Sequence, residues 1–227
     1  MLQTAKPIWP ENPTIAAPYI QIITNGTNEI PKPPPVYIGV DTETSGLDCD
    51  KHGLLQIGAA ATSATGFLLD VFKYDVDPGF VEFDEKALEI NGFTSDRIRL
   101  APRRGLVAKE FGKWLDSFGN VILVFHNAPF DVAFLQQAFR AEGVPLDHFR
   151  RVRDTATMSP DVYGESNYPR SLKNICEKLG IVNAKEHDAF ADAYATIQVF
   201  HRMRQILDDR RQPKNTAPGY IARGILH

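Results

Sequence analysis

The stretch VYIGVDTETSGLD, residues 36–48, predicts a short buried strand that ends in two acidic residues. The apolar run of residues 36–40 suits a strand that is covered on both faces. Side chains two apart in a strand point to the same face, so Asp41 and Glu43 should lie side by side at the end of a sheet, where α/β proteins usually keep their sites. A three-residue Asp-x-Glu pattern also fits an ordinary polar strand end, whereas the whole string through Asp48 favours a functional site.

The rest of the chain predicts an α/β domain with a mixed five-stranded sheet flanked by helices. Three successive strands, two of them joined by a short polar turn at residues 63–66, indicate an antiparallel meander, after which helices and strands alternate. The predicted strands cover residues 36–41, 54–62, 67–74, 121–125 and 152–157. The predicted helices cover residues 84–90, 103–117, 130–142, 171–179 and 189–207.

The composition changes at both ends of this domain. Residues 1–35 contain eight prolines and predict a proline-rich N-terminal extension, with one candidate edge strand at residues 19–23. Residues 36–208 form the predicted domain, and residues 209–227, with their mixture of arginine, proline and glycine, predict a flexible C-terminal tail. The apolar end of that tail could dock on a partner.

The overall composition excludes several classes of protein. The formal net charge of −3 lacks the basic character of a protein that coats nucleic acid, although it leaves room for an enzyme that grips a few nucleotides. Two cysteines are too few for a disulfide framework. No apolar stretch reaches the length of a membrane span and no secretory signal is recognisable, so we expect a cytoplasmic protein.

Two further blocks carry chemically capable side chains. In HNAPFD, residues 126–131, Asp131 follows a strand and stands in the first turn of a predicted helix, where the helix dipole alone would also favour an acid. In HDAFAD, residues 187–192, Asp188 is a natural N-cap, which leaves His187 on the preceding loop and Asp192 on the helix. Singly, each could be an ordinary surface residue. Together with Asp41 and Glu43, these carboxylates could hold two divalent cations beside a histidine base, as hydrolysis of a phosphodiester requires.

Taken in order, the three blocks resemble the motifs of the DEDDh 3′-to-5′ exonucleases, in the proofreading and RNase T-like branch of the ribonuclease H-like superfamily. Residues 89–94, 154–155 and 171–180 add linking features of that family. The resemblance implies that Asp41, Glu43 and Asp192 bind one metal ion, and that Asp41 and Asp131 serve a second, Asp131 partly through water. It also implies that His187 is the general base. Asp188, and not tyrosine, stands four residues before Asp192, which disfavours the tyrosine variant of the family.

The resemblance further implies a grip on the terminal nucleotides through four positions. Thr44 would contribute its backbone, Asn127 a hydrogen bond, and Leu47 and Phe93 apolar contacts with bases. For Leu47 and Phe93, packing in the core is an equal alternative.

The leading hypothesis is therefore a two-metal 3′-to-5′ exonuclease that releases nucleoside 5′-monophosphates, mainly from single-stranded DNA, in proofreading or repair. Its cofactors would be two Mg²⁺ or Mn²⁺ ions, because all the ligands are oxygens. Its partners would be DNA or RNA 3′ ends and a polymerase or other protein bound through the N-terminal arm or C-terminal tail. The alternatives are an exoribonuclease that trims RNA 3′ ends and a catalytically silent nucleic-acid-binding scaffold.

Overall fold

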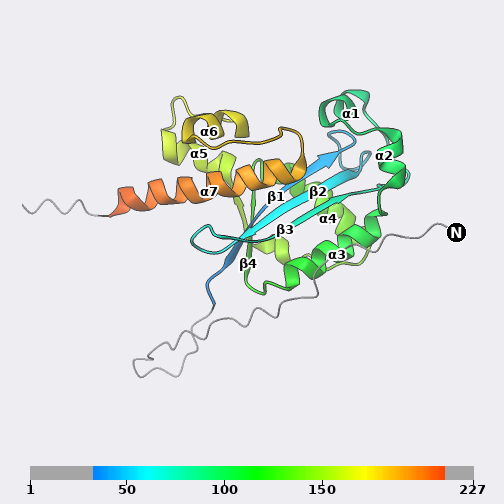
Figure 1. The fold of residues 1–227 in the computed structure, drawn as a ribbon, viewed down its shortest axis with the longest axis horizontal. Helices are drawn as coiled ribbons and strands as arrows, with labels where there is room; N and C mark the ends of the chain where they lie inside the picture. The colour runs from blue at the N-terminus through cyan, green and yellow to red at the C-terminus, as the bar shows by residue number, and fades with distance from the viewer. Residues whose placement is uncertain (1–32, 213–227) are drawn as a thin grey trace, which may run out of the picture. The chain divides into compact units, whose positions relative to one another are not determined.

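The computed structural model describes residues 33–212 and contains one sheet of five strands in the order β3-β2-β1-β4-β5 (Figure 1). Strand β2 pairs antiparallel with both β3 and β1, whereas β4 and β5 continue the sheet in parallel with β1. The strands are β1 (Val36–Thr44), β2 (Leu54–Thr62), β3 (Leu68–Asp75), β4 (Val121–Phe125) and β5 (Val152–Asp154). The predicted mixed five-stranded sheet is confirmed.

Helices cover both faces of this sheet. The long helix α7 lies across one face, and α3 and α4 lie on the other (Figure 1). The helices are α1 (Glu85–Asn91), α2 (Ser95–Leu100), α3 (Arg104–Asp116), α4 (Ala128–Ala141), the 3-10 helix η1 (Asp147–Arg150), α5 (Thr155–Tyr163), α6 (Leu172–Leu179) and α7 (Ala189–Arg211). Within residues 33–212, none of them combines the length and apolar character needed to cross a membrane.

Alternation along β1 divides its side chains between the two faces. Ile38 and Val40 are fully buried in the main core, together with Phe111 of α3 and Phe134 of α4. Gly39 between them faces α7, and a methyl group added there would lie 2.4 Å from a carbonyl oxygen of α7. The same alternation carries the next two odd-numbered residues, which are both acidic, to the α7 face.

Glycines let α7 approach the sheet closely. A Cβ atom at Gly58 of β2 would lie 2.2 Å from backbone atoms of Ala189 and Phe190 in the first turn of α7. Since real Cβ contacts are never that short, only glycine permits this backbone approach. The first turn of α7 therefore rests directly on β2, opposite Asp41 in the strand register.

The structure corrects several of the predicted elements. The predicted strand at residues 152–157 is wrong beyond Asp154, because the Asp154 carboxylate accepts the Ala156 N–H and begins α5. Helices α2 and α5 and the turn η1 were not predicted, and β1 continues to Thr44. Helix α7 runs four residues past the predicted end, so residues 209–211 of the predicted tail are helical. The candidate strand at residues 19–23 lies outside the described residues.

Candidate active site

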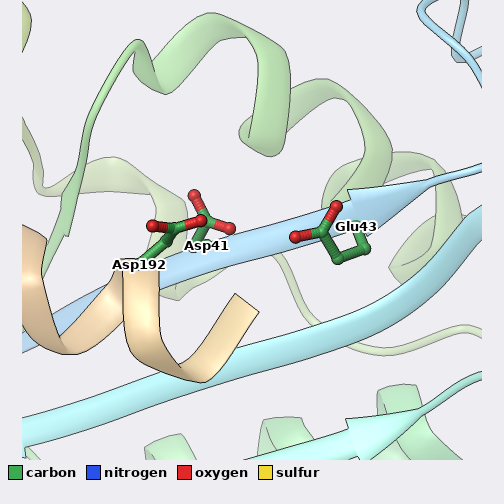
Figure 2. Close-up of side chains that lie close together, drawn as sticks. All are labelled: Asp41, Glu43 and Asp192. Carbon is green, nitrogen blue, oxygen red and sulfur yellow. The ribbon is translucent and has the colours of Figure 1, made fainter. Parts of the chain in front are cut away.

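Strand β1 and helix α7 bring three of the predicted carboxylates into one cluster. Asp41 and Glu43 project from the end of β1 and Asp192 from the first turn of α7, as Figure 2 shows. One ligand oxygen from each of the three lies within 4.8 Å of the other two. All three side chains are partly exposed, so that the cluster opens to solvent.

Two donors orient the carboxylate of Asp192. The backbone N–H of His187 donates to its Oδ2 at 3.0 Å, and the side-chain amide of Asn183 donates to its Oδ1. Both donors lie in the loop between α6 and α7. This loop therefore fixes Asp192 as well as carrying the predicted base.

The fourth predicted carboxylate, Asp131, lies in the first turn of α4 and is 3% exposed. Its Oδ1 accepts both the backbone N–H of Thr42, at 2.9 Å, and the Thr42 hydroxyl, at 2.8 Å. Strand β4 pairs with β1 only up to Gly39, which leaves the end of β1 open to the N-terminus of α4. Asp131 thus contacts the strand residue between Asp41 and Glu43, although it is not one of the three clustered ligands.

Burial and mutual repulsion make the clustered acids hard to ionise. Burial, followed by the charges of Asp131, Asp192 and Glu43, raises the pKa of Asp41 well above its ordinary value. Burial, followed by the charge of Asp192, raises the pKa of Glu43 to about 8. Burial raises the pKa of Asp131 to about 7 even though Thr42 donates to its ionised form. Burial likewise raises the pKa of Asp192. A positive charge between these groups would relieve the repulsion.

The donor set fits hard divalent cations. Asp41, Glu43 and Asp192 offer carboxylate oxygens only, which suits Mg²⁺ or Mn²⁺ better than a metal that prefers nitrogen or sulfur ligands. Asp131 adds a further carboxylate close enough to raise the pKa of Asp41. A site with these ligands and this repulsion can hold divalent metal ions.

Backbone strain is concentrated beside the two helices that supply the site. Among the described residues, only Asn127 and His187 have a positive φ without being glycine, at 71° and 60°. Asn127 is the residue before α4, and His187 precedes Asp188, the N-cap of α7. Left-handed non-glycine residues cost energy and gather at functional sites. His187 lies on the loop before α7, as predicted, and its side chain is exposed.

Sequence reasoning missed Asp154, the acid that hydrogen-bonds the strained backbone at the start of α4. Asp154 at the end of β5 accepts the backbone N–H groups of Asn127 and Ala128, each at 3.0 Å, and that of Ala156 at 2.9 Å. One carboxylate therefore ties the start of α4 to the start of α5. The Asp-Thr pair at residues 154–155 was visible in the sequence, but nothing local indicated that its carboxylate would reach residue 127.

The structure distinguishes between the four predicted substrate contacts. Leu47 is 81% exposed, which excludes core packing, and Asn127 is also exposed, with no hydrogen bond from its side chain to the start of α4. Phe93 is 5% exposed and packs with Leu55 beneath the guanidinium of Arg97, which favours core packing over base contact. Thr44 is buried, its carbonyl accepting from the side chain of Asn91.

Comparisons with known proteins agree with this geometry. A family model described as an exonuclease, RNase_T, matches residues 38–200. The DNA polymerase III subunit epsilon of Pasteurella multocida is 30% identical over 190 residues, which are 78% of this chain and 72% of that protein. The PolC-type DNA polymerase III of Oceanobacillus iheyensis is 29% identical over 77% of this chain, yet this chain spans only 12% of that polymerase.

A solved structure has the same fold. E. coli exonuclease I, in complex with a dT13 oligonucleotide, superposes with a TM-score of 0.67 at 19% identity, over 77% of this chain and 43% of that one. The likeness confirms the exonuclease type of ribonuclease H-like sheet that the sequence predicts.

Proposed function

This chain belongs to the RNase_T exonuclease family, and from that premise we propose that it is a metal-dependent 3′-to-5′ exonuclease acting mainly on single-stranded DNA ends. The products would be nucleoside 5′-monophosphates. The observation that carries the proposal is the cluster of Asp41, Glu43 and Asp192, whose ligand oxygens meet at the open end of β1.

Each side chain has a distinct task in this proposal. Asp41, Glu43 and Asp192 hold one divalent cation, and Asp41 with Asp131 serves a second. When bound, two such ions supply charge that activates a water molecule and stabilises the leaving 3′ oxygen. His187, exposed beside Asp192 on the loop, accepts the proton of the attacking water. Thr42 and Asn183 do not react and instead hold Asp131 and Asp192 in place.

The terminal nucleotides would be held by residues around the end of β1 and the start of α4. Leu47, exposed just after β1, would contact a base, and the exposed side chain of Asn127 would form a hydrogen bond with the nucleotide. The backbone at Thr44 would support the same nucleotide. We assign Phe93 a supporting role, because its ring is buried under Arg97.

The scaffold alternative requires a reason to keep repelling acids together. Four carboxylates with raised pKa values weaken the fold unless cations are bound, so their retention favours catalysis. RNA trimming remains the second candidate, since none of the assigned contacts reads a 2′-hydroxyl group. A polymerase partner is a proposal by analogy with the epsilon subunit, and a cytoplasmic location is a proposal from the sequence composition.

The test is a cleavage assay on a 5′-labelled single-stranded DNA and a matched RNA, each with Mg²⁺, Mn²⁺ or EDTA. We expect a ladder that shortens from the 3′ end of DNA, requires metal and is slower on RNA. Faster shortening of RNA would favour the trimming enzyme. No cleavage of either by the folded protein would overturn the proposal in favour of a scaffold.

A further inference from the structure

The first turn of α7 is held on the sheet by an ion pair outside the carboxylate cluster. Lys73 of β3 donates from Nζ to both carboxylate oxygens of Asp188, at 2.8 and 2.6 Å. Asp188 is also the N-cap of α7 and accepts the backbone N–H of Ala191 at 3.3 Å. The Asp188 side chain is 7% exposed, so this ion pair is largely shielded from water on the acid's side.

A second contact holds the next residue of the same turn. The side-chain oxygen of Gln56 on β2 accepts the backbone N–H of Ala189 at 2.9 Å, and its amide nitrogen donates to Asp75 at 2.6 Å. Asp75 is fixed in turn by two hydrogen bonds of 2.7 Å from Arg97. Gln56, Lys73 and Asp188 are called the α7 clamp below.

Two residues of the α7 clamp, Gln56 and Lys73, are aligned across the sheet with the proposed metal ligands of β1. In the strand register, Glu43 stands opposite Gln56, and Asp41 stands opposite Gly58, which in turn faces Lys73. Opposed residues in antiparallel strands share one face of the sheet. The clamp therefore fixes α7 on the face from which Asp41 and Glu43 project.

Asp188 lies close in the chain to His187 and Asp192, the two residues that the loop and α7 bring to the site. His187 directly precedes Asp188, has a φ of 60° and donates its N–H to Asp192. A shift of Asp188 would therefore move His187 and Asp192 together relative to β1. We propose that Lys73 is a positioning residue, which through Asp188 sets the distance of His187 and Asp192 from Asp41 and Glu43. This inference rests on the proposed exonuclease function.

Three variants of the full chain test the role of Lys73. Lys73→Met removes the ion pair between β3 and Asp188 and leaves Asp188 the longer contact with Lys185, at 3.4 Å. It keeps the length of the side chain and should fold because Lys73 is 44% exposed. Lys73→Arg keeps the charge and the donors. The matched control is Arg104→Met, which breaks a partly buried ion pair with Glu142 on the α3 and α4 side of the sheet.

We expect Lys73→Met to lower kcat on single-stranded DNA by about 10- to 100-fold with little change in KM, because small misplacements of reacting groups cost rate. Lys73→Arg should restore most of kcat. Arg104→Met should lower Tm without lowering kcat. Hydrogen exchange in the metal-free protein should quicken over residues 183–196 in Lys73→Met and stay unchanged there in Arg104→Met.

Two results would overturn the inference. One is a Lys73→Met protein with wild-type kcat and wild-type exchange over residues 183–196. The other is a loss of kcat that Lys73→Arg fails to restore while exchange over those residues stays unchanged. A wild-type protein without nuclease activity would instead defeat the proposed function, and the exchange measurement alone would then decide whether Lys73 fixes this turn.

Discussion

At the scale of single residues, Asp41 is the carboxylate on which we expect the site to depend most. The negative charges of Asp131 and Asp192 both repel its carboxylate, and burial makes its ionised form costly without a cation. Asp41→Asn keeps the size of the side chain and removes the charge, so we predict a loss of kcat on the order of 1,000-fold. Asp96→Asn, which changes an exposed acid of α2, is the control and should keep full activity. The initial rate in Mn²⁺ is the measurement, and a fully active Asp41→Asn protein would refute the assigned site.

The role of the His187 imidazole can be tested separately because the hydrogen bond from His187 to Asp192 comes from its backbone N–H. His187→Asn removes the imidazole, keeps the N–H that orients Asp192, and tolerates the positive φ of this position better than alanine does. We predict a fall in kcat of about 100-fold or more with little change in Mn²⁺ affinity by calorimetry. A variant that loses metal affinity in step with rate would show that His187 acts on the site's structure, not as the base.

The acidic blocks were predictable from sequence because their residue types and order are unusual. The supports of those acids were not predictable. Asp154, Asn183 and Lys73 contact residues 9 to 115 positions away in the chain, through side-chain contacts that no local period records. Position-by-position reasoning therefore finds the candidate reacting groups and misses the residues that orient them.

At the scale of elements, the approach of α7 to β2 depends on glycine. Gly58→Ala would place a methyl group 2.2 Å from the backbone of α7, and neither backbone can move aside cheaply. We predict a loss of unfolding free energy of about 3 kcal/mol. Gly105→Ala on α3 is the control, since the added methyl group meets only the carboxylate end of Glu142, which can rotate away. Urea unfolding of both variants measures the difference, and equal stabilities would contradict the tight packing of α7.

The predicted element boundaries were correct where the hydrophobic pattern was strong and wrong where a helix cap sets the boundary. Strands β2 and β4 match their predicted ranges, because continuous apolar runs end at polar residues. Residues 155–157 were read as strand, yet the Asp154 cap turns them into α5. Short segments between caps carry too few residues for a period to be read.

At the scale of the whole molecule, the acidic site should make the metal-free protein less stable as pH rises. The pKa of Glu43 is raised to about 8 and that of Asp131 to about 7, so the folded state holds these protons after the unfolded chain has released them. The free energy of unfolding therefore falls progressively as pH rises from about 4 to 8. Asp75 and Asp188, whose pKa values are lowered, contribute stability that is lost only below about pH 4, outside this window.

The corresponding measurement is Tm in EDTA from pH 5 to 8. We predict a decline over this range, a shallower one in Glu43→Gln, and a stabilisation by Mn²⁺ that is larger at pH 8 than at pH 5. A Tm in EDTA that rises toward pH 8, or that Mn²⁺ leaves unchanged at pH 8, would be incompatible with the raised pKa values and the metal site.

The central claim is that cations held by Asp41, Glu43, Asp131 and Asp192 act on the phosphate at a 3′ end. The most direct test uses a 5′-labelled single-stranded DNA with one phosphorothioate, of defined configuration, at its 3′-terminal linkage. We predict that the sulfur of one configuration blocks shortening in Mg²⁺ and that the softer Mn²⁺ restores it. Normal shortening of the blocked strand in Mg²⁺, or inhibition that no metal relieves, would contradict a metal centre acting on the 3′-terminal phosphate.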